Sequence, residues 1–254
     1  MKDKFKGVKK FIFETSVIII GISISFWLGN LQERSNNHKK EIEILESIEI
    51  NINEIQKYLD NRRETLDADN QLMDYLSTNW NSLNLDSIVE VLQNGRHMKA
   101  FHNVFLDYRE FHPPVSEITS IIGDGSISLI SNHEIKIQLI SLMDNSYDFV
   151  NQNVKSEIEL QQSFREQLVL ENSYEISKIL ETTQDEMKKR VSGEVDNRQK
   201  ILAELKAITK LRTAKNYLNL KIRQRYWVMN FYNSFDRNLK RLNEMVVEEL
   251  QSIK

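Results

Sequence analysis

The 254-residue chain contains no cysteine. This absence excludes disulfide bonds, zinc sites built from thiolates, iron–sulfur clusters and cysteine nucleophiles. The chain is therefore chemically compatible with an oxidising or a reducing compartment. Its net charge is only −3, and a mildly acidic protein of this kind does not have the composition of a general nucleic-acid binder.

Residues that interrupt helices are also scarce. There are seven glycines, and the only two prolines are adjacent, at Pro113 and Pro114. Sheets with many strands need turns at short intervals, and such turns use glycine and proline. The scarcity of both residues therefore predicts an all-α protein built from long helices.

Recognisable catalytic motifs are absent as well. The sequence has no G-x-S-x-G, no P-loop, no dinucleotide-binding glycine pattern and no H-E-x-x-H. His97, His102 and His112 lie near Asp107 and Glu110, but histidines five residues apart point to different faces of a helix. We therefore expect no catalytic residue, no cofactor and no metal, and an enzyme with an unrecognised site is the least favoured alternative.

A long hydrophobic run near the N-terminus is the most informative feature. The eighteen residues 15–32 carry no charge, and a helix over residues 11–31 would be about 30 Å long, the thickness of a bilayer's hydrocarbon core. A signal peptide has a shorter apolar stretch that ends in small residues, whereas this one ends in Phe26, Trp27 and Leu28. We therefore predict an uncleaved transmembrane helix over 11–31, with a cleaved signal and a buried soluble helix as the alternatives.

Positive charge predicts the orientation of this helix. Five lysines lie in the basic tail 1–10, whereas the cations that follow the span are Arg34, Lys39 and Lys40. Because cations favour the cytoplasmic side of a membrane helix, we expect the N-terminus inside and residues 32–254 in the periplasm, on a bacterial inner membrane. A tail this short cannot carry a signal by itself, so a membrane partner or self-association is expected.

One face of the predicted span is suited to packing against another helix. Glu14, Gly21, Ser25 and Gly29 are spaced by seven, four and four residues, so they share a face. Small residues at every fourth position allow close approach of a second helix. Glycine and serine are also common in membrane helices without such a role, and this alternative stays open. Glu14 is expected to reach the cytoplasmic interface rather than to relay protons.

Beyond the span, apolar residues recur at helical spacing. A helix that continues from the span is predicted over 32–78, followed by short helices and loops over 79–132. The stripes hold few polar residues, which argues against a ligand pocket. The buried stripe of the first of these helices is predicted at Leu45, Ile48, Ile52, Ile55, Leu59 and Leu66.

Two long helices are predicted to follow, over 133–192 and 196–253. They form an antiparallel hairpin or coiled coil that turns at Gly193, and a break near Glu171 to Tyr174 is left open. The whole extracytoplasmic part is therefore expected to be an elongated antiparallel helical bundle.

A helix–turn–helix motif is predicted within the residues Ser116 to Ile140. A helix is expected to end near Gly123, a tight turn to use Gly125, and Asn132 to cap the next helix.

Charge supports the hairpin. Eight acidic residues lie between Glu157 and Glu186, nine cations lie between Arg198 and Arg225, and a turn at Gly193 places the two blocks side by side. We interpret the cations as a basic face that sets the register with the acidic block. The alternative partner is an anionic membrane surface or nucleic acid, and nucleic acid is disfavoured outside the cytoplasm. The basic face consists of Lys206, Lys210, Arg212, Lys215, Lys221, Arg223 and Arg225.

Two stretches resemble the DUF6090-type membrane proteins of Bacteroidota. The first is "FETSVIIIGISISFWLGNLQERSNNHKKEIEIL", a span that ends in an aromatic residue and is followed by a polar Glu-Arg stretch. The second is "ITSIIGDGSISLISNHEIKIQLISLM", which has Gly125, Leu129, Ile130 and Asn132 in place. The two cover about a quarter of the chain. The resemblance implies a membrane-anchored helical protein and brings no active site.

The sequence thus favours a membrane-anchored, non-enzymatic scaffold or interaction subunit. Its expected partners are the lipid bilayer and either a second copy of the chain or another membrane protein. The alternative is a ligand-sensing extracytoplasmic bundle coupled to a separate membrane protein, with its small-molecule ligand unknown.

Overall fold

The computed structural model describes residues 2–84, 87–88, 100–170, 189 and 198–254. Within these ranges the chain forms helices, turns and loops and has no strand, which confirms the all-α class. The predicted turn at Gly193 and the residues Glu171 to Tyr174 lie outside the described part of the chain.

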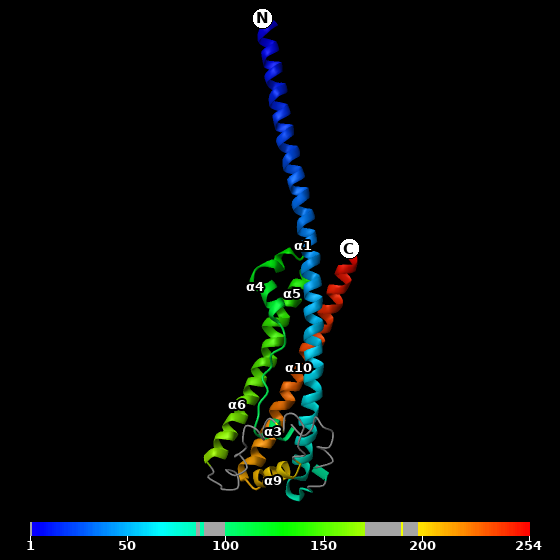
Figure 1. Ribbon diagram of the computed structural model, residues 1–254. Coiled ribbons are helices and arrows are strands. Elements are labelled where there is room, and N and C mark those ends of the chain that lie inside the picture. The colour runs from blue at the N-terminus through cyan, green and yellow to red at the C-terminus, as the bar shows by residue number, and fades with distance from the viewer. Residues whose placement is uncertain (1, 85–86, 89–99, 171–188, 190–197) are drawn as a thin grey trace.

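The first element, α1 (Lys2–Asn79), is one uninterrupted helix. Its first part projects beyond the rest of the molecule, as Figure 1 shows, and every residue from Ser16 to Lys40 is exposed. Among the described residues this is the one helix long and apolar enough to cross a membrane, and its apolar part is not buried by any other element. The same helix then enters the folded body at Glu41, its first buried residue.

The second part of α1 is a core helix. The stripe predicted from the spacing is confirmed, because all six of its side chains are buried in the structure: Leu45, Ile48, Ile52, Ile55, Leu59 and Leu66. The stripe forms since residues three and four positions apart lie on one side of a helix. The first part of this single helix is therefore exposed, whereas its second part buries one face against the body.

All the remaining elements are shorter than α1. A 3-10 turn, η1 (Trp80–Ser82), ends α1. The elements that follow are α3 (Ala100–Phe105), α4 (Ser116–Gly123), the 3-10 turn η3 (Ser126–Leu129), α5 (His133–Ser141), the π-helical segment η4 (Leu142–Tyr147), α6 (Asp148–Leu170), α9 (Arg198–Thr209) and α10 (Arg212–Ile253). Because η4 joins α5 to α6 directly, residues 133–170 form one helical run with a π-turn inside it.

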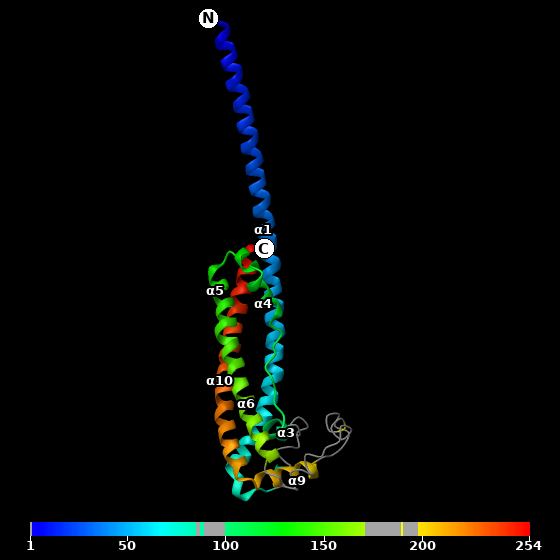
Figure 2. The ribbon, with the colours of Figure 1, turned by 90° about the vertical axis from the view of Figure 1, so that its left-hand side faces the viewer.

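The long helices α1, α6 and α10 lie side by side, and α10 runs opposite to the other two (Figures 1 and 2). Contacts between the helices fix their axial register. The Tyr232 hydroxyl donates a hydrogen bond to the Leu59 carbonyl at 2.7 Å. Lys254, the last residue of the chain, forms an ion pair with Glu46 at 2.6 Å. The C-terminal end of α10 therefore lies beside the point where α1 enters the body.

The apolar interior consists of two separate cores. The first core joins the stripe of α1 from Leu45 to Leu59 with α4, α5 and the second half of α10. The second core lies at the far end, where Leu72 and Leu76 of α1 meet Phe164 of α6 and Leu218 of α10. On each of the three long helices, buried polar or charged residues lie between the two cores, and they form the site described below.

The last helical segment differs from the prediction. One helix was expected over 196–253, but α9 ends at Thr209 and α10 begins at Arg212, with Leu211 in an extended conformation (φ −76°, ψ 128°). The reason is packing: α9 crosses the end of the body (Figure 2), so that Leu205 and Ile208 cover the second core. A straight continuation of α10 would carry both side chains away from this core.

The helix–turn–helix motif has the predicted geometry. α4 ends at Gly123, Gly125 adopts φ +83°, and the Asn132 side chain accepts hydrogen bonds from the backbone N–H groups of Glu134 and Ile135. This turn is also tied to its neighbours. The backbone N–H and the hydroxyl of Ser131 donate to the Glu41 carboxylate, and Asn132 donates to Glu249 at 2.6 Å. The turn therefore holds α1 and α10 together where α1 enters the body.

We predict that Gly125→Ala lowers the melting temperature of the full-length protein in detergent, whereas Gly123→Ala does not. A methyl group at either position meets no other atom within 4 Å, but only Gly125 has a positive φ. An L-residue in that conformation costs about 1 kcal/mol, and alanine in a helix is more stable than glycine. Melting followed by circular dichroism distinguishes the two variants, and equal effects would contradict the structure of this turn.

Candidate functional site

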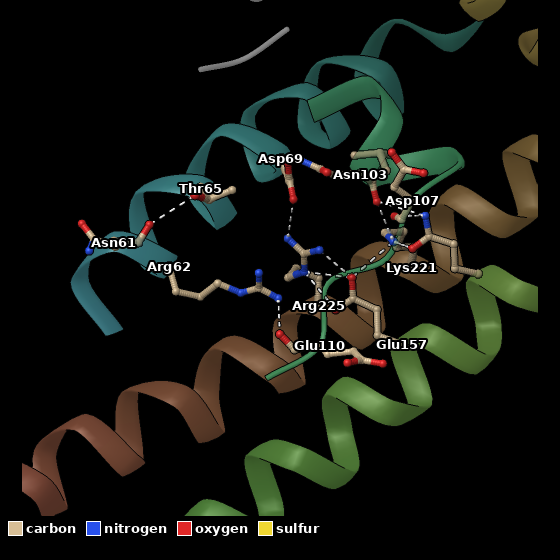
Figure 3. A network of polar contacts seen from close by, with 12 residues as sticks. Asn61, Arg62, Thr65, Asp69, Asn103, Asp107, Glu110, Glu157, Lys221 and Arg225 are labelled. Atoms are coloured by element: carbon tan, nitrogen blue, oxygen red, sulfur yellow. Dashed lines mark hydrogen bonds and ion pairs between the residues drawn. The ribbon is translucent and has the colours of Figure 1, made fainter. Parts of the chain in front are cut away.

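The polar residues between the two cores form one cluster, which we call the polar layer (Figure 3). α1, α3, α6 and α10 all contribute to it. Each of its side chains is buried: Asp69, Asn103, Glu157, Gln161, Lys221 and Arg225. The cluster thus crosses the body from α1 to α6 and α10, and in it charges and hydrogen bonds replace much of the apolar packing.

The strongest contact of the layer joins α10 to α6. The Arg225 guanidinium donates through Nε to both oxygens of Glu157, at 3.1 and 3.0 Å, and through Nη2 to Oε1 as well. The planar guanidinium matches the carboxylate, and a pair of this kind is both stronger and more directional than a single hydrogen bond. It therefore fixes the axial position of α10 relative to α6.

Lys221, one turn earlier on α10, has a partner for each of its three N–H donors. Its Nζ donates to the Gln161 side-chain oxygen, to the Asn103 carbonyl at 3.3 Å, and lies 3.3 Å from Glu157 Oε1. The amide nitrogen of Gln161 in turn donates to the carbonyls of Asn103 and Asp107. These bonds attach the end of α3 and the chain beyond it to α6 and α10.

Asp69 supplies the contribution of α1. Its Oδ1 accepts a hydrogen bond from the Asn103 amide at 3.0 Å, and its Oδ2 lies 3.6 Å from Nη1 of Arg225. The second distance is that of an ion pair without a direct hydrogen bond. Arg62, two turns earlier on the same face of α1, donates to the Glu110 carbonyl at 3.1 Å and so ties α1 to the segment before α4.

Burial and charge act against each other on these groups. Burial raises the pKa of Glu157, but Arg225 and Lys221 outweigh it and hold that pKa below its usual value. Burial also raises the pKa of Asp69, and there the nearby Arg225 does not fully compensate. Burial lowers the pKa of Lys221 to about 8, although Glu157 opposes the shift.

The charges of the layer balance. At neutral pH two carboxylates, Asp69 and Glu157, face two cations, Lys221 and Arg225. Removing four charges from water costs as much as their attraction returns, so a buried network of this kind adds little net stability compared with apolar packing. It does penalise every register in which a charge loses its partner, so its effect is to specify one alignment of α1, α6 and α10.

The structure places some residues of the predicted basic face at the surface and buries the others. Lys206, Lys210 and Lys215 are exposed, as are Arg212 and Arg223. The surface assignment is wrong for the other two members, Lys221 and Arg225, whose exposed fractions are 1% and 5%. They lie on the core stripe of α10, between Leu218 and Val228 in the helical repeat, so neither can meet a membrane or a nucleic acid.

The expectation that the buried stripes hold few polar residues is also wrong. The stripe of α10 continues through Lys221 and Arg225, that of α6 through Glu157 and Gln161, and that of α1 through Asp69. The spacing in the sequence carries this signal, because each residue falls three or four positions from a buried apolar one. Reading these residues by position rather than by charge would have found them.

The predicted packing face of α1 is exposed. Gly21, Ser25 and Gly29 line a shallow groove whose other residues include Ile18, Ile22 and Phe26. A methyl group added at Gly21 or Gly29 would meet nothing within 4 Å. Glu14 lies in α1, but its side chain is outside the described part of the structure.

The histidine cluster shows no metal site in the part of the chain that the structure describes, where no three His, Asp or Glu side chains gather in a suitable arrangement. His112 is exposed and forms a contact of 2.6 Å with Glu110. His97 and the side chain of His102 lie outside the described residues.

Comparison with protein-family models, with curated proteins and with solved structures finds no match to this chain. These comparisons do not test the resemblance to DUF6090-type proteins, which stays a prediction.

We predict that Glu157→Gln destabilises the protein by about 3 kcal/mol, because it leaves the buried charges of Arg225 and Lys221 without a carboxylate on α6. Glu159→Gln is the matched control, since Glu159 is on the same helix and exposed. Denaturant unfolding of the full-length protein in detergent, followed by circular dichroism, measures both. A shift for Glu157→Gln no larger than that of the control would show that the layer does not hold the helices in register.

Proposed function

We propose that this chain is a membrane-anchored helical interaction subunit without catalytic activity. The first part of α1 spans the bilayer, and the body carries no enzymatic site. The observation that supports this proposal most strongly is the contrast along α1. Ten large apolar side chains from Val17 to Leu31 are between 43% and 72% exposed, while the stripe from Leu45 to Leu59 on the same helix is fully buried.

The free energy of that exposure favours a lipid environment. Moving one large apolar side chain out of water is worth about 1.5 to 3 kcal/mol. Ten such side chains, about half exposed, therefore represent on the order of 10 kcal/mol, as much as the whole stability of a typical domain. Lipid tails remove this cost along the whole circumference of the helix.

The polar groups within the segment are satisfied without water. The hydroxyl of Ser23 donates to the Ile19 carbonyl at 2.8 Å, and that of Ser25 donates to the Gly21 carbonyl at 2.9 Å. A serine whose hydroxyl donates to the backbone carbonyl one turn earlier leaves no unpaired hydroxyl in a hydrocarbon environment. The backbone of the segment is helical throughout, which meets the same requirement.

Orientation and location follow from the flanking charges. The five lysines of residues 2–10 precede the span, and three cations mixed with acids follow it. This bias supports an orientation with the N-terminus in the cytoplasm and the body in the periplasm of a bacterial inner membrane.

The partner of this subunit meets it through the groove of Gly21, Ser25 and Gly29. Ser25 lies twenty residues before Leu45, which at 3.6 residues per turn places the two side chains about 200° apart around the helix axis. Since Leu45 faces the first core, the groove faces away from the body. A second helix, from another copy or from another membrane protein, can therefore reach the groove without meeting α6 or α10.

A ligand-sensing bundle is the second candidate, and the polar layer is the feature that speaks for it. The layer brings six polar side chains together in the interior, but they bind one another and their charges cancel. The cavity beside them has a volume of about 20 Å³, far below the several hundred Å³ of typical small-molecule sites. The structure of this layer thus favours the interaction subunit, and an enzyme is the least supported alternative.

Because the chain has no cysteine, its topology is measured with single-cysteine variants and a membrane-impermeant maleimide on spheroplasts. We expect Ser252→Cys to react in intact spheroplasts and Asp3→Cys to react only after lysis. The protein should stay in the membrane fraction after alkaline carbonate extraction. Release of the protein without detergent, or a mature chain that begins beyond Trp27, would contradict the proposed transmembrane anchor.

Photocrosslinking tests the partner face. A photoreactive side chain at Ser25 is expected to crosslink a polypeptide several-fold more than the same side chain at Ser23. The two serines are chemically matched and about 200° apart on the helix, so position 23 controls for lipid contact alone. Mass spectrometry identifies the product as a second copy or another membrane protein. Equal yields at both positions would argue against a specific partner face.

A further inference from the structure

Three buried polar atoms, in residues that line one small cavity, make no hydrogen bond to another protein atom. They are Oδ2 of Asp69, Nη1 of Arg225 and Nε of Arg109. All three residues line the cavity of about 20 Å³ that adjoins the polar layer. Asp69 and Arg225 have exposed fractions of 1% and 5%, so bulk water does not reach these groups freely.

The three atoms define the chemistry of an occupant. Asp69 Oδ2 needs a hydrogen-bond donor, whereas the two guanidinium nitrogens need an acceptor. The occupant must therefore donate and accept at once. Its size is limited as well, because 20 Å³ exceeds the volume that one water molecule needs by only a small margin.

A simple ion would satisfy only one side of this cavity. A cation in the cavity would lie against the guanidinium groups of Arg62, Arg109 and Arg225, which all line it. An anion would be attracted by the guanidinium groups that line the cavity, but it would leave Asp69 Oδ2 without a hydrogen-bond donor. Water is neutral and carries both donors and acceptors, so it alone satisfies both sides.

We propose that one structural water molecule is bound in this cavity and bridges Asp69 of α1 to Arg225 of α10. Its oxygen accepts from Nη1 of Arg225, and one of its hydrogens is donated to Oδ2 of Asp69. The 3.6 Å between these two atoms is too long for a direct hydrogen bond and leaves the bridge as the contact that completes the ion pair. Arg109, from the segment between α3 and α4, lines the same cavity.

The bridge gives α1 a different attachment from that of α6. Glu157 of α6 holds Arg225 directly, through three hydrogen bonds. Asp69 of α1 forms a longer ion pair with the same guanidinium, at 3.6 Å, and its hydrogen bond to that group passes through the water. Within the layer, the helix that continues into the proposed span is therefore joined to α3 by the direct Asp69–Asn103 hydrogen bond and to Arg225 of α10 through an exchangeable molecule.

A crystal structure of the full-length protein in detergent, at a resolution that shows ordered water, tests the proposal. We expect a density peak within about 3.2 Å of both Asp69 Oδ2 and Arg225 Nη1. Asp69→Glu extends the carboxylate by one carbon–carbon bond, about 1.5 Å, so it should bind Arg225 directly and abolish the peak. Asp69→Asn keeps the length of the side chain and should keep the peak.

The contrary outcomes are equally distinct. A direct Asp69–Arg225 hydrogen bond without a peak in the native protein would overturn the proposal, as would a peak that survives in Asp69→Glu. An anomalous signal in the cavity after growth in bromide would identify an anion and overturn it too. If Asp69→Glu does not fold, the native map and the bromide experiment decide by themselves.

Discussion

The structure depends on one constraint: α1 is a single helix whose two parts have different surroundings. From Ser16 to Lys40 no element of the described chain covers it, and from Glu41 onward it supplies one wall of the first core. Because no residue in between breaks the helix, a displacement of one part is transmitted to the other. The turn that carries Ser131 and Asn132 binds α1 at this junction and connects it to α10. The proposed role as an anchored interaction subunit follows from that continuity, since contacts made at the exposed part reach the body through a rigid rod.

Long apolar stripes on neighbouring helices do not by themselves define the axial register of those helices, and the polar layer does. Apolar stripes on helices of this length can slide by one turn and still pack, since one buried aliphatic side chain replaces another at little cost. A one-turn slip at the layer would instead separate Arg225 from Glu157 and leave both charges buried and unpaired. The layer lies between the two cores and therefore fixes both of them. This explains why four charges are kept in an interior where apolar residues of the same size would be at least as stable.

Much of the fold was predictable from the spacing of apolar residues and from the rarity of glycine and proline. The stripe from Leu45 to Leu66 and the turn at Gly125 are local features, and local sequence determines them. The break at Leu211 was not predictable, because no glycine or proline marks it and the packing of α9 on the second core decides it. The partners within the layer were missed for a related reason. Arg225 and Glu157 are 68 residues apart, and Arg225 was assigned to the surface because of its charge although its position in the repeat is that of a core residue.

The central claim, that α1 passes from lipid into a protein core along its length, is tested by spin labels placed one at a time from Ser16 to Ser47 in the cysteine-free chain, reconstituted in bilayers. Collision rates with oxygen and with a water-soluble nickel chelate report the surroundings of each label. The account predicts that oxygen collisions dominate up to Leu31, that nickel collisions dominate over residues 32–40, and that both fall at every third or fourth residue from Glu41 onward. Nickel access throughout residues 16–31 would contradict this claim.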